Sequence, residues 1–374
     1  MDRRWIIGGL IAVGLLVVVL YWPSGPGGVL DGVYTSGRSD VPVHKIAEDM
    51  GLITRVATTP DYAAMFVANL SGDVYVLERR GSRYVKQEVP FYHVDTGFDY
   101  EAGDENGLTG IVVSGHYAES HKVFLLYAQQ DDGVGQSQIL SLVARRDDTG
   151  NLVGTEPQVI FRGNVMARGA HQIQDAASVD IAGRPHVLFS IGESYVPAYA
   201  RQLAREAGKI MLIQEDGSDP VGERPYPQYP KVQAIGIRNA YGLDVVPGTE
   251  WVYVTDNGPD ANDRLILAPL LDPSLQFDFG WNGNPASMLQ TRRNGVLAPE
   301  LVMAHWPVPV SPAEIIAESR ESFVATTFST SYEHASYVWR GLVNTDSQLV
   351  DTQSESPRAK RGLVFYQDSW DLAD

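Results

Sequence analysis

The residues best suited to chemistry lie around two apolar runs in the middle of the chain. A Gly-Ile-Arg-Asn turn at residues 236–239 leads into one predicted strand, and a second predicted strand, residues 251–254, is followed by Asp-Asn-Gly-Pro at residues 256–259. A polar loop with Asp263 comes next. An Arg fork, amides, carboxylates and an irregular Gly-Pro backbone at strand ends commonly hold anions, metals or substrates. The alternative is an ordinary hairpin built from the usual turn residues.

Three further segments place polar residues after or between predicted strands. Residues 103–111 include Glu105, residues 169–172 include His171, and residues 208–213 read Gly-Lys-Ile-Met-Leu-Ile. A strand ending in Gly-Glu at residues 192–193 follows the histidine. The chain holds no phosphate-binding loop, dinucleotide fingerprint or nucleophile elbow, so these segments are its main chemical content.

The elements that must position these segments are strands. Runs typical of strands and hairpins recur along the body, and helical periodicity is scarce. Equivalent valines stand roughly 56 to 72 residues apart, at Val67, Val123, Val187, Val252 and Val324. A repeating all-β unit of this size predicts a β-propeller. Five units are legible, and a sixth would have to be assembled from residues 32–35 and 361–366. A stack of β-sandwiches is the alternative, but no linker interrupts residues 40–350.

Composition narrows the possible partners. The net charge of −17 argues against nucleic acid and against broad adhesion to anionic lipid. It also means that any anionic cofactor would need a local basic pocket. The chain has 0 cysteines, which excludes disulfides and thiolate metal sites. Hydrophobic residues make up 44% of the chain, enough to bury a core.

The N-terminus predicts a membrane anchor. Residues 5–21 are apolar or small without one charge, and Arg3 and Arg4 precede them. This pattern predicts one transmembrane helix within residues 1–22, a linker at 23–31 and a propeller domain at 32–374, held on the periplasmic side of a bacterial inner membrane as a single-pass protein. A cleaved signal peptide is the alternative, but no small-residue cleavage site follows the run.

Taken in order, these motifs resemble the soluble aldose sugar dehydrogenase or glucose/sorbosone dehydrogenase family. The resemblance covers roughly residues 52–281. Its motifs stand at residues 107–111, at His171, and at residues 208–213, 236–239, 258–263 and 279–281. The resemblance implies a six-bladed propeller that oxidises a sugar hydroxyl with pyrroloquinoline quinone (PQQ) and Ca²⁺. Because the chain ends at Asp374, the last blade is expected to be incomplete.

The resemblance also implies catalytic residues. His171 matches the family's general base, and an imidazole that titrates near neutrality suits removal of the hydroxyl proton. Asp263 falls where the family has an Asp that hydrogen-bonds near the catalytic histidine.

Cofactor contacts follow from the same resemblance. Arg238 and Asn239 match residues that contact the quinone and its carboxylates, and a planar Arg fork suits paired oxygens. Glu105 falls where some members have Gln. The backbone carbonyls of Gly258 and Pro259 match ligands of the Ca²⁺, which prefers such oxygens.

Several departures put the cofactor site in question. The family's Asp-Glu pair reads Asp263-Arg264 here, and His171 is followed by Gln172 rather than by glycines. Residues 324–329 lack the family's Lys, and residues 358–361 match its Arg pair poorly. A tricarboxylate quinone would therefore lack much of its counter-charge, and burying unpaired carboxylates is costly.

Two functional interpretations follow. In the first, the chain is a membrane-tethered periplasmic aldose dehydrogenase that uses PQQ and Ca²⁺. In the second, it is a non-catalytic propeller that has lost its cofactor, binds neither PQQ nor Ca²⁺, and serves as an extramembrane subunit of an integral membrane complex, respiratory or photosynthetic. The sequence leaves both open, as it leaves open whether the chain is an enzyme at all.

Overall fold

The structure is a computed structural model that describes most of the body of the chain. The described residues are 33–35, 42–44, 46–47, 49–98, 105–131, 134–167, 170–306, 311–327, 337–343, 358–359 and 363–369. The predicted anchor at residues 1–22 and the linker at 23–31 lie outside them. Among the residues that are described, no helix is long and apolar enough to cross a membrane.

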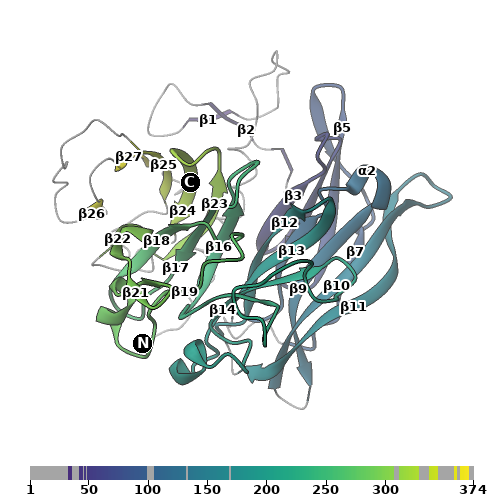
Figure 1. Cartoon of the computed structure of the whole chain (residues 1–374). Helices are drawn as coiled ribbons and strands as arrows, with labels where there is room; N and C mark the ends of the chain where they lie inside the picture. The colour runs from purple at the N-terminus through teal and green to yellow at the C-terminus, as the bar shows by residue number, and fades with distance from the viewer. Residues whose placement is uncertain are drawn as a thin grey trace, which may run out of the picture.

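The first two sheets are antiparallel and come from consecutive parts of the chain (Figure 1). The first contains β3 (Ile53–Thr58), β4 (Ala64–Asn69), β5 (Asp73–Arg80) and β6 (Arg83–Lys86), with β7 (Tyr92–His93) also on β5. The second contains β8 (Leu108–Val113), β9 (Lys122–Asp131), β10 (Val134–Arg146) and β11 (Leu152–Ala167). A short helix, α2 (Tyr117–Ser120), joins β8 to β9.

Three more sheets follow in the same order along the chain. The third contains β12 (Ile173–Ile181), β13 (Arg184–Ile191), β14 (Lys209–Gln214), β15 (Val232–Ile235), β19 (Phe277–Asp278), β20 (Arg292–Arg293) and β21 (Val296–Leu297). The fourth contains β16 (Ala240–Val245), β17 (Val252–Asp256), β18 (Asp263–Ala268), β22 (Val302–Trp306) and β26 (Arg358–Ala359). The fifth contains β23 (Pro312–Ala317), β24 (Ser322–Thr327), β25 (Tyr337–Val343) and β27 (Leu363–Ser369). Three 3₁₀ helices lie in loops: η2 (Pro197–Arg201), η3 (Pro285–Leu289) and η4 (Pro299–Leu301).

The hydrophobic core is divided into layers between consecutive sheets. One cluster joins the first and second sheets through Phe66 and Leu125, and the next joins the second and third through Phe124 and Phe189. Further clusters join the third sheet to the fourth and the fourth to the fifth. Inner strands β3, β8, β12, β16 and β23 contact one another in that order. Sheets stacked face to face around a shared set of inner strands form a propeller, so the predicted repeating all-β architecture is confirmed.

The strands proposed for a sixth unit pair differently from the prediction. Residues 32–35 were expected to meet residues 361–366, but β1 (Val33–Thr35) pairs with β2 (Pro42–His44). β27 instead pairs with β25 as the outer strand of the fifth sheet. The seven residues of β25 offer a longer hydrogen-bonding edge than the three of β1, which favours this arrangement.

Candidate functional site

The centre of the site is a buried histidine held by a carboxylate. His171 lies just before β12, and its Nδ1 is 2.8 Å from Oε1 of Glu193, which follows β13. Their side chains are only 5% and 3% exposed. Because a carboxylate only accepts hydrogen bonds, Nδ1 carries the proton and donates it, and Nε2 keeps the lone pair that a general base requires. In the sequence Glu193 stands at a predicted strand end, and no motif there indicates its role.

The backbone around His171 is unusual and tightly packed. His171 has φ of 58°, in the left-handed region that residues with a side chain rarely occupy. Its carbonyl accepts a hydrogen bond from the Ser194 N–H at 3.2 Å. A Cβ at Gly192 would lie 2.7 Å from the His171 carbonyl carbon, so only glycine fits there. Such backbone strain persists where surrounding contacts over-determine it, and it is enriched at functional sites.

Glu105 connects two other predicted site residues, His171 and Asn239. Its Oε2 accepts from the backbone N–H of His171 and from Nδ2 of Asn239, each at 3.2 Å. Burial raises the pKa of Tyr241 well above its usual value, and the hydrogen-bonded Glu105 carboxylate raises it further. The second, third and fourth sheets thus meet at the segments that lead into β8, β12 and β16.

The Gly-Ile-Arg-Asn turn places Arg238 beside this centre. The Arg238 carbonyl accepts from the backbone N–H of Glu193 at 2.8 Å, which links the turn to the carboxylate that holds His171. The Arg238 guanidinium donates to the Asn257 carbonyl at 2.9 Å and lies over the Trp281 ring, 5.7 Å from its centroid. This guanidinium is half-buried and retains further donors for a ligand.

Arg264, the apparent departure from the family, has a structural role. Its side chain is fully buried, and its guanidinium donates to Oδ2 of Asp256 at 2.6 and 3.1 Å. It also donates to the carbonyls of Gly236, Phe279 and Met288. Asp256 in turn accepts from the backbone N–H of Asn239 at 2.7 Å. This cation therefore supports the turn from behind and is inaccessible to any ligand.

Asp263 fixes the loop that carries Gly258 and Pro259. Its Oδ1 accepts from the Gly258 N–H at 2.6 Å and its Oδ2 from the Ser311 N–H at 2.7 Å. A Cβ at Gly258 would lie 1.9 Å from the Ala261 carbonyl oxygen, so this loop requires glycine. The carboxylate that meets His171 is Glu193, whereas Asp263 binds loop backbone. Among the described residues, no group of three or more His, Asp or Glu side chains is arranged to hold a metal ion. The assignment of the Gly258 and Pro259 carbonyls to Ca²⁺ stays a prediction.

Lys209, from the Gly-Lys-Ile motif, stabilises a neighbouring loop. Its Nζ donates to the carbonyls of Tyr199, Ala200 and Ala207 at 2.8–2.9 Å. Burial lowers the pKa of Lys209 to about 7. With three protein acceptors already bound, this ammonium holds η2 against β14 and has no donor left for a ligand.

Unpaired polar atoms surround the Arg238 side of the site. Of the buried side-chain atoms without a hydrogen-bond partner among the described residues, four lie on this side: Glu193 Oε2, Asn239 Oδ1, Asn257 Oδ1 and Trp281 Nε1. A buried polar atom without a partner costs about 1–3 kcal/mol. Three of these atoms are oxygens that suit a donor or a cation on a ligand, whereas the Trp281 N–H and the half-buried Arg238 guanidinium suit an anionic oxygen. The site therefore fits a polar ligand of mixed character, and it offers few cations to the carboxylates of a quinone.

An aromatic ring covers the histidine. The Tyr195 ring centroid is 4.4 Å from that of His171, at an interplanar angle of 33°. Tyr195 is 56% exposed and has a left-handed φ of 57°. A mostly exposed ring therefore packs against the nearly buried imidazole.

A second charged cluster links the inner strands, and no sequence motif indicates it. Arg55 on β3 contacts Asp175 on β12 at 3.1 Å and Glu314 on β23 at 2.5 Å, and it also donates to the Tyr241 carbonyl. Nearby Asp244 on β16 accepts from the backbone N–H groups of Val245 and Ala317, each at 2.8 Å. We call Arg55, Asp175, Asp244 and Glu314 the axial cluster.

Comparison with known proteins defines the family. The profile of the glucose/sorbosone dehydrogenase family matches residues 53–287, and the chain therefore belongs to that family. It is 21% identical over 187 residues to the aldose sugar dehydrogenase YliI of Escherichia coli, covering 49% of this chain and 48% of the relative. It is 28% identical over 180 residues to an uncharacterized protein of Synechocystis, covering 44% and 42%. The chain spans about half the length of these curated relatives.

Solved structures share the fold. The PQQ-bound aldose sugar dehydrogenase of Streptomyces coelicolor superposes with a TM-score of 0.62 at 19% identity, covering 84% of this chain and 83% of that one. The apo form of the soluble aldose sugar dehydrogenase of E. coli gives a TM-score of 0.58 at 16% identity, with 86% of each chain covered. At these identities the structural similarity establishes the fold alone. This chain has the mostly-β fold of the six-bladed propellers in the family.

Proposed function

We propose that the chain is a sugar dehydrogenase that oxidises an aldose hydroxyl with PQQ as the hydride acceptor and Ca²⁺ as the accompanying metal. The observation that carries the proposal is the buried Glu193–His171 pair with a free Nε2 at the mouth where Arg238 and Asn239 converge. Family membership and the PQQ-bound form of a structural neighbour support it.

In this proposal the proton chemistry belongs to His171. Nε2 takes the proton of the sugar hydroxyl, and the Glu193 carboxylate stabilises the resulting imidazolium and fixes the ring. When bound, the quinone would accept the hydride that leaves the carbon bearing this hydroxyl. Burial of both side chains limits exchange of this proton with bulk water.

Residues on the other side of the mouth bind and orient the anionic group. Arg238 would pair with a carboxylate, and the Trp281 N–H would donate to a further oxygen. Asn239 and Asn257 offer amide oxygens to any donor on the ligand. The carbonyls of Gly258 and Pro259 are the proposed Ca²⁺ ligands.

Calorimetric titration of the full chain with PQQ in excess Ca²⁺ tests the site. The proposal predicts saturable binding of one quinone per chain, weakened about 10- to 100-fold in Arg238→Gln through loss of a charge-assisted hydrogen bond. Arg320→Gln is the matched control, since that guanidinium lies over Trp251, away from the site. Equal affinities in the two variants would contradict the role of Arg238.

The non-catalytic scaffold remains the second candidate, and one observation favours it. The Tyr195 ring packs against the imidazole of His171 and occupies space beside the base that a substrate would need. Absence of quinone binding in the same titration, together with recovery of the chain in fixed ratio with integral membrane proteins, would support a subunit of a membrane complex.

We further propose that residues 1–22 anchor the propeller on the periplasmic side of a bacterial inner membrane. The uncharged apolar run after Arg3 and Arg4 supports this. N-terminal sequencing of the protein from its native membrane is the test. A mature N-terminus near Gly25 or later would identify a signal peptide instead.

A further inference from the structure

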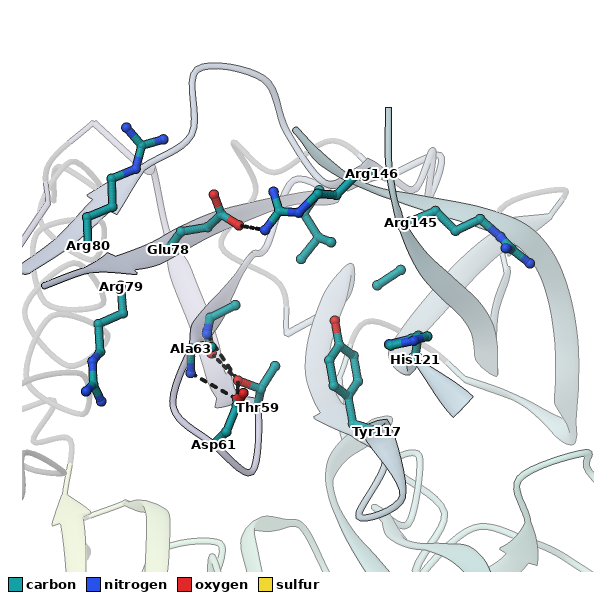
Figure 2. Close-up of a pocket in the computed structure, with 13 residues that line it drawn as sticks. Thr59, Asp61, Ala63, Glu78, Arg79, Arg80, Tyr117, His121, Arg145 and Arg146 are labelled. Atoms are coloured by element: carbon teal, nitrogen blue, oxygen red, sulfur yellow. Dashed lines mark hydrogen bonds and ion pairs between the residues drawn. The ribbon is translucent and has the colours of Figure 1, made fainter. Parts of the chain in front are cut away.

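An open cavity lies between the first and second sheets. Its volume is about 720 Å³, which is typical of small-molecule sites. Four arginines line it in two adjacent pairs, Arg79–Arg80 at the end of β5 and Arg145–Arg146 at the end of β10. We call this cavity the arginine groove (Figure 2).

The arginine groove opens on the face of the propeller opposite to the His171 site. Glu105, which contacts His171, comes just before the start of β8, whereas Tyr117 of the groove follows the end of the same strand. β10 runs in the same direction as β8, because each is antiparallel to β9 between them, and Arg146 is its last residue. A ligand in the groove is therefore separated from the site by the length of a strand.

The interior of the groove is apolar on one side and has an aromatic wall. Ala64, Ala144 and Leu152 are buried and line it. The Tyr117 ring stands beside them, with its hydroxyl directed toward Arg146 and Glu78 (Figure 2). Burial raises the pKa of Tyr117 to about 12, so the hydroxyl stays protonated and available as a donor at neutral pH.

The rim carries excess positive charge in a chain whose net charge is −17. Arg146 pairs with Glu78 at 2.5 Å and Arg145 with Glu156 at 2.6 Å. Among the described residues, neither Arg79 nor Arg80 has an ion-pair partner within 4.0 Å. Asp61 also lines the groove, but its Oδ1 accepts from Thr59 Oγ1 at 2.6 Å and from the Ala63 N–H at 3.0 Å.

The balance of these charges favours an anion. The four arginines outnumber the two lining carboxylates, Glu78 and Asp61. In an acidic protein, unpaired arginines would be expected to recruit the abundant carboxylates, yet Arg79 and Arg80 remain open to solvent. Guanidinium groups bind carboxylates through two parallel hydrogen bonds, which makes them suited to a planar anionic group.

We propose that the arginine groove binds a small organic carboxylate with a flat apolar body. The body packs against Tyr117 and the apolar residues, and the carboxylate binds at the arginine rim. The apolar residues alone would accept a neutral ring, and the arginines alone would hold a simple ion, so the combination selects a ligand with both features.

Isophthalate, a benzene ring with two carboxylates, is a suitable probe, and its neutral diamide has nearly the same shape. Calorimetric titration of the full chain should give saturable isophthalate binding with a Kd below about 1 mM, and binding of the diamide at least about tenfold weaker. Equal affinity for the two compounds, or no saturation with isophthalate up to about 10 mM, would overturn the proposal. This comparison uses the unaltered chain and so does not depend on how any variant folds.

A variant locates the binding site. Arg79→Gln with Arg146→Gln should weaken isophthalate binding by about 10- to 100-fold, and Arg320→Gln should leave it unchanged. The double variant removes only exposed side chains, so its melting temperature should stay near that of the parent. Unchanged isophthalate affinity in the double variant would place the ligand elsewhere and refute the assignment.

Discussion

The His171 site and the axial cluster are two buried charged regions built on the same inner strands, and they differ in how completely their polar atoms are paired. In the axial cluster, Arg55 binds two carboxylates and a carbonyl, and Asp175 also accepts from the Leu243 N–H at 2.7 Å. On the Arg238 side of the His171 site, four buried polar atoms, those of Glu193, Asn239, Asn257 and Trp281 named above, have no partner among the described residues.

This difference separates a structural centre from a ligand site. Buried charge alone does not distinguish them, since both regions contain ionisable groups in a low-dielectric interior. The polar atoms of a fully paired cluster gain nothing from a ligand, whereas unpaired atoms beside a guanidinium with donors to spare can gain hydrogen bonds. Arg264 follows the same rule. Its guanidinium is paired with a carboxylate and three carbonyls, and its role is structural.

The largest expected effect is on the axial cluster. Arg55→Met removes the cation between Asp175 and Glu314 and should lower the free energy of unfolding by about 3–5 kcal/mol at pH 7, because buried carboxylates lose their partner. Chemical denaturation measures it. PQQ affinity of the folded protein should remain close to that of the parent. If Arg55→Met left stability unchanged and abolished quinone binding, the axial cluster would be the ligand site and not a structural centre.

The axial cluster should also make stability depend on pH. Burial raises the pKa of Asp244 from 3.8 to about 7, and burial likewise raises that of Glu314 well above its usual value. A raised carboxyl pKa means that the folded state holds the proton more tightly. This stabilisation is complete below about pH 4 and is lost as the pH rises through about 7.

Denaturation curves between pH 4 and 8 test this dependence. Asp244 alone changes the free energy of unfolding by at most about 1.4 kcal/mol per pH unit, and any water that reaches its carboxyl group lowers this value. Asp244→Asn should flatten the profile in this window, and Asp148→Asn, which alters an exposed carboxylate in the turn between β10 and β11, should not. Identical profiles for parent and Asp244→Asn would exclude Asp244 as the titrating group.

A smaller effect is expected from the carboxylate behind the histidine. Glu193→Gln keeps the side-chain shape but removes the charge that stabilises the imidazolium, and it should lower kcat for aldose oxidation about tenfold. The affinity for quinone should hardly change, since Glu193 binds the base and not the cofactor. A loss of quinone affinity with an unchanged kcat would contradict this prediction.

The smallest effect on stability is expected from the ring that covers the site. Tyr195→Ala removes a ring that is mostly exposed, so the free energy of unfolding should change by about 0.5 kcal/mol or less. Tyr253→Ala, at a fully buried ring, should cost about 3–5 kcal/mol and serves as the comparison. A large loss in Tyr195→Ala would indicate that this ring is part of the core.

The sequence was informative where local pattern decides structure. Apolar runs around Val67, Val123, Val187, Val252 and Val324 all fall on strands of the propeller sheets. His171, Glu105 and Asn239 lie in contact because each stands in a segment that leads into an inner strand, while their roles in catalysis and cofactor binding stay predictions. The sixth unit was not predictable in the same way, since short end strands carry little pattern.

Long-range pairing explains what the sequence analysis missed. Arg264 was interpreted as a cation replacing a site carboxylate, but its buried partner Asp256 is on the adjacent strand and shows only in three dimensions. Glu193 stands 22 positions after His171, and Arg55 stands 120 before Asp175. No motif spacing connects such residues, because the loops between their strands vary freely in length.

Aldose-dependent dye reduction by the full chain loaded with PQQ and Ca²⁺ tests the central claim most directly. The measurement compares the parent, His171→Ala and the control His93→Ala, an exposed histidine on β7, at equal quinone loading. If His171 is the general base, His171→Ala should be slower by at least about 10²-fold, and His93→Ala should match the parent. Equal rates for the parent and His171→Ala would contradict the account.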